Sequence, residues 1–343
     1  MATDLYGLSR VTGEQGVLPQ RARVVDASLP LRAGELLIDV ESLNIDAASF
    51  KQLKDSAGGD SGKIVEAVRA IVAERGKMQN PVTGSGGMLI GRVREVSPEH
   101  PGFGTLKVGD RLATLVSLTL TPLVIASVRG IRPEIDRIDI TGHAILFPSG
   151  IYAKLPDDLP DTLSLAALDV AGAPALVARW VKPGQTVVML GAGKSGALCL
   201  AQAREAMAGN GTLIALDISK AALDALQGIG LCDAVVACDA TKGVDVMREV
   251  SRLTNGAMAD LVVNCASVGN TEMASILSVK NGGTVIFFSM ATSFTAAALG
   301  AEGVGKDVTM LVGNGYVPGH AELTLGLLRR NPKLRGLFEQ RYT

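Results

Sequence analysis

The sequence predicts a two-domain α/β protein, in which a β-rich domain precedes a doubly wound parallel sheet. The first observation is length, because 343 residues suffice for two domains. The second is pattern: residues 1–155 contain strand-like runs, whereas apolar strands alternate with helical stretches over residues 156–315. The third is the glycine turn GAGKSG at residues 191–196, which joins a strand to a helix in this second region.

The first domain is predicted from three runs. ELLIDVESLNI (35–45) and MLIGRVREVS (88–97) are strand-like, and LKVGDRLATL (106–115) is a turn entering a strand. Between them, apolar residues at 64, 65, 68, 71 and 72 fall on one face of a helix, with Asp60 or Ser61 as its N-cap. Residues 117–143 fit no single pattern.

The second domain is predicted to contain six apolar strands, at residues 186–190, 212–217, 234–240, 259–267, 283–290 and 308–314. A terminal helix is expected over residues 319–338. Residues 281–301 carry no charge and match a membrane span in length, but glycines and hydroxyl residues interrupt them. They therefore indicate a buried strand followed by a polar loop.

The glycine turn is compatible at first sight with two phosphate-binding motifs. A P-loop requires a glycine five residues before Gly193, where this chain has Val188 inside a strand. The dinucleotide pattern Gly191-x-Gly193-x-x-Gly196 fits, and Asp217 ends the next strand 26 residues after Gly191. A carboxylate there can accept hydrogen bonds from the adenosine ribose hydroxyls and would repel a 2′-phosphate, which favours NAD over NADP. Lys194 either contacts phosphate or is a solvated lysine at the start of the helix.

Composition excludes several function classes. The net charge is −1 and aromatic residues make up 3%, so neither nucleic acid nor an anionic membrane is an expected partner. The four cysteines form no CxxC pair and there are only three histidines, so no metal site is expected. Unpaired apolar cysteines suit a reducing cytoplasm, and the N-terminus lacks the apolar core of a signal peptide.

Several stretches carry a family resemblance. SLNIDAASF (42–50), LKVGDRLATL and the glycine turn resemble the medium-chain dehydrogenase/reductase superfamily, in which a GroES-like catalytic domain adjoins a Rossmann domain. Ile45 and GSGGMLIG (84–91) replace the residues expected of zinc-dependent members. More specifically, ERGKMQNPVTGSGGMLIG (74–91), ALDVAGAPA (167–175) and FFSMATSFTAAALGAEGVGKD (287–307) resemble the family of L-erythro-3,5-diaminohexanoate dehydrogenases.

This resemblance implies oxidative deamination of a diamino acid in lysine degradation, with NAD or NADP as the oxidant. Such chemistry needs a general base and carboxylates that hold ammonium groups. Without the resemblance, the residues support only an NAD(P)-dependent oxidoreductase. The alternatives are a zinc-free alcohol, quinone or enoyl reductase of the superfamily, and a dinucleotide-binding protein without enzymatic activity.

The candidate residues follow from these arguments. The predicted catalytic residues are Asp46, Asp169, Glu302 and Lys306, and the predicted substrate-binding residues are Thr83, Ser85 and Lys77. The predicted cofactor-binding residues are Gly191, Ala192, Gly193, Lys194, Ser195, Gly196, Asp217, Ile218, Asp239, Cys265, Ala266, Ser289 and Met290. The superfamily resemblance further implies a homodimer through the strand at 308–314, and residues 316–343 are expected to pack back on the first domain.

Overall fold

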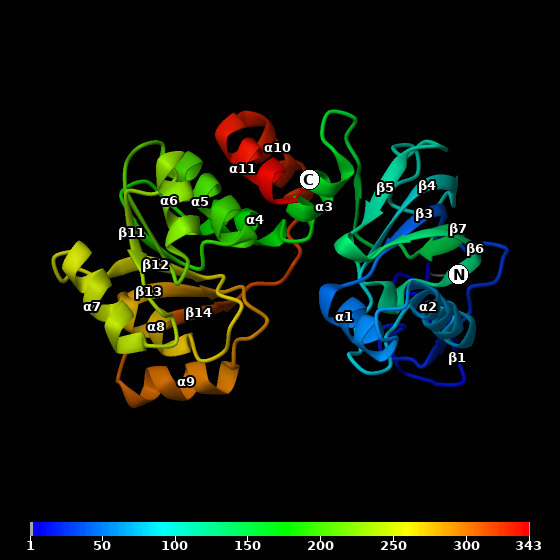
Figure 1. Ribbon diagram of the computed structural model, residues 1–343, viewed down its shortest axis with the longest axis horizontal. Helices are drawn as coiled ribbons and strands as arrows, with labels where there is room; N and C mark the ends of the chain where they lie inside the picture. The colour runs from blue at the N-terminus through cyan, green and yellow to red at the C-terminus, as the bar shows by residue number, and fades with distance from the viewer. Residues whose placement is uncertain (1–2, 343) are drawn as a thin grey trace. The chain divides into compact units, whose positions relative to one another are not determined.

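The computed structural model describes residues 3–342, which divide into two compact units (Figure 1). The first unit ends at Asp157 and the second begins at Asp158. The sequence pattern predicts this boundary between residues 155 and 156.

The first unit is built on a six-stranded antiparallel sheet with the order β6-β7-β3-β4-β5-β8. Its strands are β3 (Leu36–Asn44), β4 (Met88–Val96), β5 (Arg111–Thr114), β6 (Leu123–Arg132), β7 (Arg137–Leu146) and β8 (Tyr152–Lys154). A small separate hairpin pairs β1 (Val11–Thr12) with β2 (Val24–Val25). The ambiguous stretch before residue 143 therefore supplies β6 and most of β7, which pair with each other.

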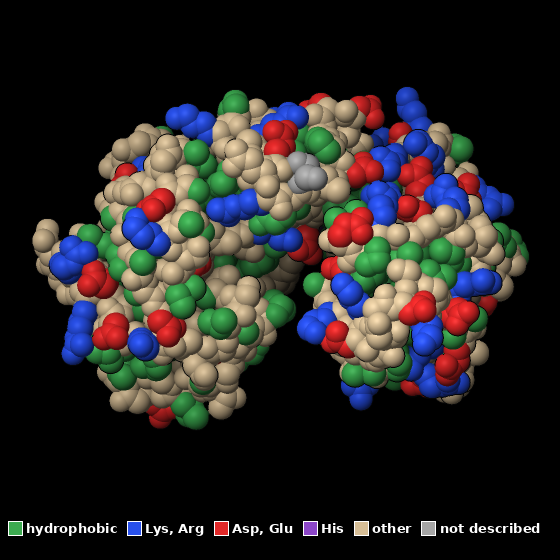
Figure 2. Space-filling view, in the orientation of Figure 1, with side chains coloured by type: hydrophobic (Ala, Val, Ile, Leu, Met, Phe, Trp, Pro, Cys, Tyr) green, Lys and Arg blue, Asp and Glu red, His purple; other side chains and the backbone are tan. Residues whose placement is uncertain are grey.

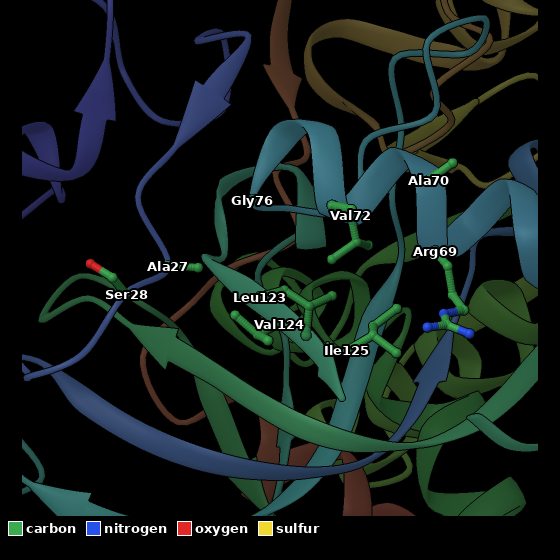
Figure 3. Close-up of a pocket in the computed structure, with 10 residues that line it drawn as sticks. Ala27, Ser28, Arg69, Ala70, Val72, Gly76, Leu123, Val124 and Ile125 are labelled. Carbon is green, nitrogen blue, oxygen red and sulfur yellow. The ribbon is translucent and has the colours of Figure 1, made fainter. Parts of the chain in front are cut away.

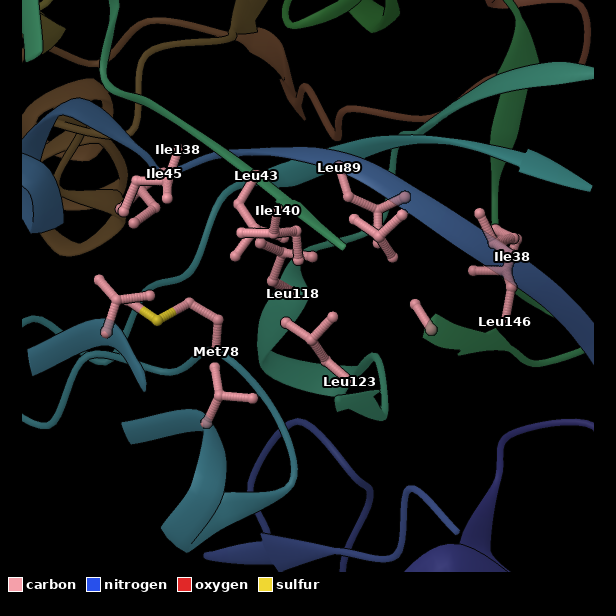
Figure 4. Packing of buried hydrophobic residues seen from close by; sticks show 14 of the residues in the cluster. Ile38, Leu43, Ile45, Met78, Leu89, Leu118, Leu123, Ile138, Ile140 and Leu146 are labelled. Atoms are coloured by element: carbon pink, nitrogen blue, oxygen red, sulfur yellow. The ribbon is translucent and has the colours of Figure 1, made fainter. Parts of the chain in front are cut away.

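Two helices, α1 (Ala47–Ser56) and α2 (Ser61–Arg75), accompany this sheet. Asp60 caps α2 as predicted, because its side chain accepts the backbone N–H of Lys63 at 3.0 Å. The apolar face of α2 is buried in the same core as side chains from β3, β4 and β7 (Figure 4). This core fixes β3 and the start of α1, where the candidate residue Asp46 lies.

The second unit is a parallel sheet with the order β11-β10-β9-β12-β13-β14. Its strands are β9 (Thr186–Leu190), β10 (Thr212–Asp217), β11 (Ala234–Ala237), β12 (Ala259–Asn264), β13 (Val279–Phe287) and β14 (Val308–Val312). The first three strands extend the sheet in one direction, and the chain then returns to the other side of β9. All six strands were predicted, and their order is that of a Rossmann fold.

Helices cover both faces of this sheet, with α4, α5 and α6 on one side and α7, α8 and α9 on the other (Figure 1). Their bounds are α3 (Asp161–Leu168), α4 (Gly172–Trp180), α5 (Lys194–Met207), α6 (Lys220–Gly228), α7 (Gly243–Leu253), α8 (Glu272–Ser278) and α9 (Phe294–Gly303). The uncharged stretch 281–301 is therefore most of β13 followed by α9, rather than one span.

The C-terminal segment forms two helices, α10 (His320–Arg330) and α11 (Pro332–Tyr342), instead of one. Both pack against helices of the second unit: α10 contacts α3, α4 and α5, and α11 contacts α3. The structure therefore assigns this segment, which was expected to belong with the first domain, to the second unit. Its buried apolar face, which includes Leu325, Leu328 and Phe338, is used within the second unit.

Charged side chains of both signs are interspersed on the face shown in Figure 2, in keeping with the net charge of −1. Within residues 3–342, no single helix has the length and apolar composition needed to cross a membrane. The bent pair α3 and α4 passes that test on length and composition alone, and most of its apolar residues are buried in the second unit.

Candidate functional site

The strand order creates a topological switch point between β9 and β12. The chain leaves the carboxyl end of β9 toward β10 and the carboxyl end of β12 toward β13, so the two connections diverge. Ligands of open α/β sheets bind in the crevice at such a point, beyond the carboxyl ends of the strands. The glycine turn follows β9 and residues 265–271 follow β12, so both predicted cofactor segments border this crevice.

Each glycine of the turn meets a different steric demand. Gly191 adopts a φ of 99°, which disfavours a side chain. A Cβ on Gly196 would lie 1.9 Å from the carbonyl oxygen of Gly191, so only glycine lets α5 approach β9 so closely. A Cβ on Gly193 would meet nothing within 4 Å, and its φ of −75° is open to other residues. The space beside Gly193 is thus the part of the turn that is free for a ligand.

The N-terminus of α5 is suited to an anion. Gly193 is the N-cap and supplies no side-chain oxygen to the N–H groups of the first turn, which includes Ser195. These groups and the helix dipole favour a negative charge there. The turn therefore fits the diphosphate of a dinucleotide, as an open space lined by backbone donors.

Asp217 at the end of β10 is tied to the turn. Its Oδ2 accepts the N–H of Ala192 at 2.6 Å, and its Oδ1 accepts the N–H of Ser219 at 2.7 Å. The next side chain, Ile218, is 79% exposed. Asp239, after β11, accepts the hydroxyl of Thr241 at 2.7 Å, and this bond helps to hold the pKa of Asp239 below its usual value. Asp217 is thus positioned by backbone donors, as a ribose-binding carboxylate requires.

The residue that organises the end of β12 escaped the sequence analysis. Asn264 is fully buried, and its Nδ2 donates to Thr271 Oγ1 at 2.8 Å and to Ser275 Oγ at 2.9 Å. Its Oδ1 accepts the N–H of Ala266 at 3.1 Å, which fixes the segment carrying the half-buried Cys265. A single amide has no periodicity or motif, so no sequence signal marked it.

The Asn264 backbone also connects to the next loop. Its carbonyl accepts the N–H groups of Phe288 and Ser289 at 2.9 and 3.2 Å, so one residue holds the loops after β12 and β13. In that second loop, Met290 is 84% exposed, and its side chain is free to contact a ligand. These segments border the switch point from the β12 side.

Two predicted catalytic residues lie at the wrong edge of the sheet. Glu302 is exposed near the end of α9, and Lys306 lies just before β14. Because α9 runs from the carboxyl end of β13 to the amino end of β14, both residues lie opposite the cofactor edge. Lys306 donates to the carbonyl of Leu277 at the end of α8 at 2.9 Å, and burial lowers its pKa. Their assignment to catalysis is wrong.

Asp169 also has a different setting from the one predicted. The sequence context suggested a buried carboxylate, but Asp169 is exposed at the C-cap of α3. Its Oδ2 lies 2.6 Å from Nζ of Lys194, the first residue of α5. The pair therefore belongs to the surroundings of the glycine turn.

In the first unit, Asp46 and Thr83 belong to one hydrogen-bonded group. Asp46 is the N-cap of α1, and its Oδ1 accepts the N–H of Ser49 at 3.0 Å. The hydroxyls of Ser49 and Thr83 are 2.6 Å apart, and the N–H of Ser85 donates to Thr83 Oγ1 at 3.3 Å. The structure therefore brings together Asp46, Thr83 and Ser85, which the sequence analysis had nominated separately.

A buried amide holds this group in place. Asn80 is fully buried, and its Nδ2 donates to Gln52 Oε1 on α1 at 2.8 Å. Its Oδ1 accepts the N–H groups of Val82 and Thr83 at 2.8 and 3.2 Å. Gly87 closes the loop, because a Cβ there would lie 2.1 Å from the carbonyl oxygen of Asn44. Asn80, which sequence reasoning also missed, therefore fixes the loop against α1.

Two acceptor oxygens at this place lack partners among the described residues. They are Oδ1 of Asn44, the last residue of β3, and Oδ2 of Asp46, and both atoms are buried. Burial raises the pKa of neighbouring Asp136; Lys54 opposes this rise and Asp46 adds to it. Unpaired buried acceptors are costly, so they indicate a place where a donor such as an ammonium group would be stabilised.

Lys77 does not join this group. Its side chain is fully buried, and Nζ donates to the carbonyls of Pro19 and Gln20 at 2.6 and 3.3 Å. Burial lowers the pKa of Lys77 to about 8. Since its ammonium group is used inside the first unit, the prediction that it binds substrate is wrong.

Possible metal ligands and a surface groove are the remaining features of the described residues. Within residues 3–342, no three or more His, Cys, Asp or Glu side chains are grouped so that they could hold a metal ion. A groove of about 540 Å³ opens between α2 and β6 in the first unit (Figure 3). It is lined mostly by small and apolar residues, with Arg69 supplying charge, and none of the predicted site residues lines it.

Two solved structures share the fold of this chain at low sequence identity. An alcohol dehydrogenase from Thermotoga maritima is 19% identical, with a TM-score of 0.55 over 89% of this chain and 84% of that chain. A mycobacterial protein solved in complex with NADPH is also 19% identical, with a TM-score of 0.53 over 97% of this chain and 88% of that chain. These likenesses confirm the predicted combination of a GroES-like and a Rossmann domain.

Sequence similarity is more specific. The family model described as the L-erythro-3,5-diaminohexanoate dehydrogenase N-terminal domain matches residues 9–156. Relatives named L-erythro-3,5-diaminohexanoate dehydrogenase, from Acetoanaerobium sticklandii and Fusobacterium nucleatum, are each 52% identical over 98% of this chain and 98% of their own length. The chain therefore belongs to the family of L-erythro-3,5-diaminohexanoate dehydrogenases.

Proposed function

We propose that this protein oxidatively deaminates L-erythro-3,5-diaminohexanoate to 5-amino-3-oxohexanoate and ammonia, with a nicotinamide dinucleotide as oxidant. The observation that carries the proposal is 52% identity over 98% of the chain to relatives that bear this enzyme's name. The glycine turn at the switch point agrees with it, because the reaction requires a dinucleotide site. Such full-length similarity favours this function over a quinone or enoyl reductase.

The cofactor would be held by four segments of the second unit. The backbone of residues 191–196 would bind the diphosphate, where Gly193 leaves open space. Asp217 would accept the adenosine ribose hydroxyls, and residues 265–266 and 289–290 would border the nicotinamide half. A bound nicotinamide ring would supply the hydride acceptor for oxidation at C3 of the substrate. The carboxylate of Asp217 favours NAD over NADP, since a 2′-phosphate would be repelled.

The substrate amine must be neutral before hydride can leave C3, so a group of the protein must accept a proton. We assign this acceptor to Asp46, whose Oδ2 is buried without a partner. Asn44 Oδ1, also unpaired, would accept an N–H of the same amine. Water would then add to the resulting iminium carbon and release its two protons to solvent as the C3 carbonyl forms. The carboxyl group of Asp46 would return its proton to the nitrogen, which leaves as ammonia.

Hydroxyl groups near Asp46 would orient the rest of the substrate. The exposed Thr83 and the half-buried Ser85 lie on the loop that Asn80 fixes against α1. Their hydroxyl and backbone donors suit the substrate carboxylate. This assignment replaces Lys77, whose ammonium group is buried elsewhere.

The proposal is tested by NADH formation with purified protein and L-erythro-3,5-diaminohexanoate, against lysine, 3-aminobutyrate and simple alcohols. We expect turnover with the diamino acid and release of one ammonia per NADH. Asp46→Asn should lower kcat strongly while NADH binding is kept, because the asparagine cannot accept the proton. Turnover of an alcohol or quinone in preference to the diamino acid would refute the proposal.

The cellular setting is part of the same proposal. We propose a role in lysine degradation in the cytoplasm, which agrees with four cysteines that are all free. We further propose a homodimer through β14, the edge strand of the second sheet. Val312 on β14 and Phe294 and Leu299 on α9 are 62%, 54% and 63% exposed, which supports an apolar contact. Light scattering would test it, and a monomer at micromolar concentration would contradict it.

A further inference from the structure

The ion pair between Asp169 and Lys194 lies beside the glycine turn and is not used by the mechanism above. Lys194 Nζ lies 2.6 Å from Asp169 Oδ2 and 5.9 Å from the ring centre of Tyr342 on α11. The Lys194 side chain is 27% exposed and that of Asp169 is 51% exposed, so solvent and solute ions reach the pair. Three segments of the second unit therefore meet at the side chain of Lys194.

Both charges lie at helix ends where the helix dipole disfavours them. Lys194 is the first residue of α5, where the positive end of the helix dipole disfavours a cation. Asp169 is the C-cap of α3, where the negative end of the dipole disfavours an anion. Helix stability therefore does not explain either residue. Each charge is offset by the other, and Lys194 would gain further from a second anion at the turn.

We propose that Asp169 sets the affinity of the dinucleotide site by competing with the cofactor phosphates for Lys194. This inference rests on the proposed binding of a nicotinamide dinucleotide at residues 191–196. In the free protein, the Asp169 carboxylate neutralises the Lys194 ammonium group. When the diphosphate binds, Lys194 turns toward it, and the loss of its ion pair with Asp169 offsets part of the gain. Asp169 is thus an affinity-setting residue that keeps binding reversible, rather than the catalytic carboxylate predicted from sequence.

The effect should be modest and dependent on salt. The Lys194–Asp169 pair is exposed to solvent, and the loss of such a pair on binding changes affinity by about two- to five-fold. Screening at physiological ionic strength acts over about 8 Å, so the effect should shrink as salt is raised. A purely structural role for Asp169 would not give this salt dependence.

The test is NADH binding, measured by fluorescence, to the full-length wild-type protein and its variants at low and high salt. We expect Asp169→Asn to bind NADH about two- to five-fold more tightly at low salt. Lys194→Gln should bind more weakly, and the double variant should bind like Lys194→Gln alone. Asp224→Asn is the matched control, because it removes a carboxylate 2.7 Å from Lys220 on α6 and should leave binding unchanged.

Melting temperatures verify that the variants fold, and Asp169→Ser provides a second neutral replacement at this exposed position. The inference is overturned if Asp169→Asn and Asp169→Ser bind NADH no more tightly than wild type, or if their gain persists in the Lys194→Gln background. A wild-type protein that binds neither NADH nor NADPH would instead overturn the proposed function and this inference with it. If the wild-type protein binds NADH and the Asp169 variants bind it with the same affinity, only this inference is overturned and the proposed function stands.

Discussion

Replacing Gly193 by alanine should separate cofactor binding from stability. The backbone at Gly193, with φ of −75° and ψ of −160°, accepts an L residue, and an added Cβ would meet nothing within 4 Å. The folded protein should therefore tolerate the change, and the loss of chain entropy in the unfolded state should stabilise it by about 0.4–1 kcal/mol. The new methyl group would, however, occupy the space in which we place the diphosphate.

The expected loss of affinity follows from overpacking. Forcing an extra carbon into a close contact costs about 1–3 kcal/mol, which corresponds to about a 5- to 150-fold weaker binding of NADH. Gly196→Ala should behave differently, because its Cβ would lie 1.9 Å from the carbonyl oxygen of Gly191. The helix would have to move by roughly 1 Å from β9, so both the melting temperature and NADH binding should fall.

The assay combines thermal unfolding with NADH fluorescence titration. Gly228→Ala, at the end of α6, is the control, because it also adds a Cβ that meets nothing within 4 Å. It should change neither affinity nor fold. If Gly193→Ala binds NADH as tightly as wild type while remaining folded, the diphosphate does not bind at this turn and the cofactor assignment fails.

Three further predictions concern single charges. Asp217→Ala should shift cofactor preference toward NADP, measured as the ratio of kcat/KM for NADP and NAD; an unchanged ratio would count against the ribose assignment. Lys306→Ala should lose about 0.5–1.5 kcal/mol of unfolding free energy, through its bond to Leu277, yet keep kcat/KM. Because the pKa of Lys77 falls from its usual 10.5 to about 8, the unfolded chain binds an extra proton between these pH values. The free energy of unfolding, from urea titrations, should therefore rise with pH across that window, and Lys77→Met should lose this rise.

The helices and strands that could be predicted from the sequence are those with a clear local pattern of apolar residues. The six strands of the second unit are continuous apolar runs, and α2 shows helical periodicity with Asp60 as its cap. The segment 117–143 gave no clear pattern, because β6 is an edge strand with many half-exposed residues. The pairing of β6 with β7 is what makes it a strand, and that information is not local. The helix α1 was missed for a similar reason, since its short apolar face is completed by the core around it.

Charged residues could not be placed from sequence, because their roles depend on which edge of the sheet they occupy. Glu302 and Lys306 follow β13 in the chain, but α9 carries them to the opposite edge. Asp169 follows an apolar run, yet it is exposed and paired with Lys194. Once these three are removed, the surviving catalytic candidate is Asp46.

The case for Asp46 rests on a feature that only the structure supplies. Its Oδ1 caps α1, which fixes the direction of the side chain and leaves Oδ2 buried without a partner beside the end of β3. A carboxylate that served only as a cap would expose its second oxygen to water, since burying an unpaired acceptor costs about 1–3 kcal/mol. The unpaired Asn44 Oδ1 adds a second such cost. An ammonium or amine donor would supply the partner that Asp46 Oδ2 lacks, and this supports the proposed role of Asp46 at the substrate amine.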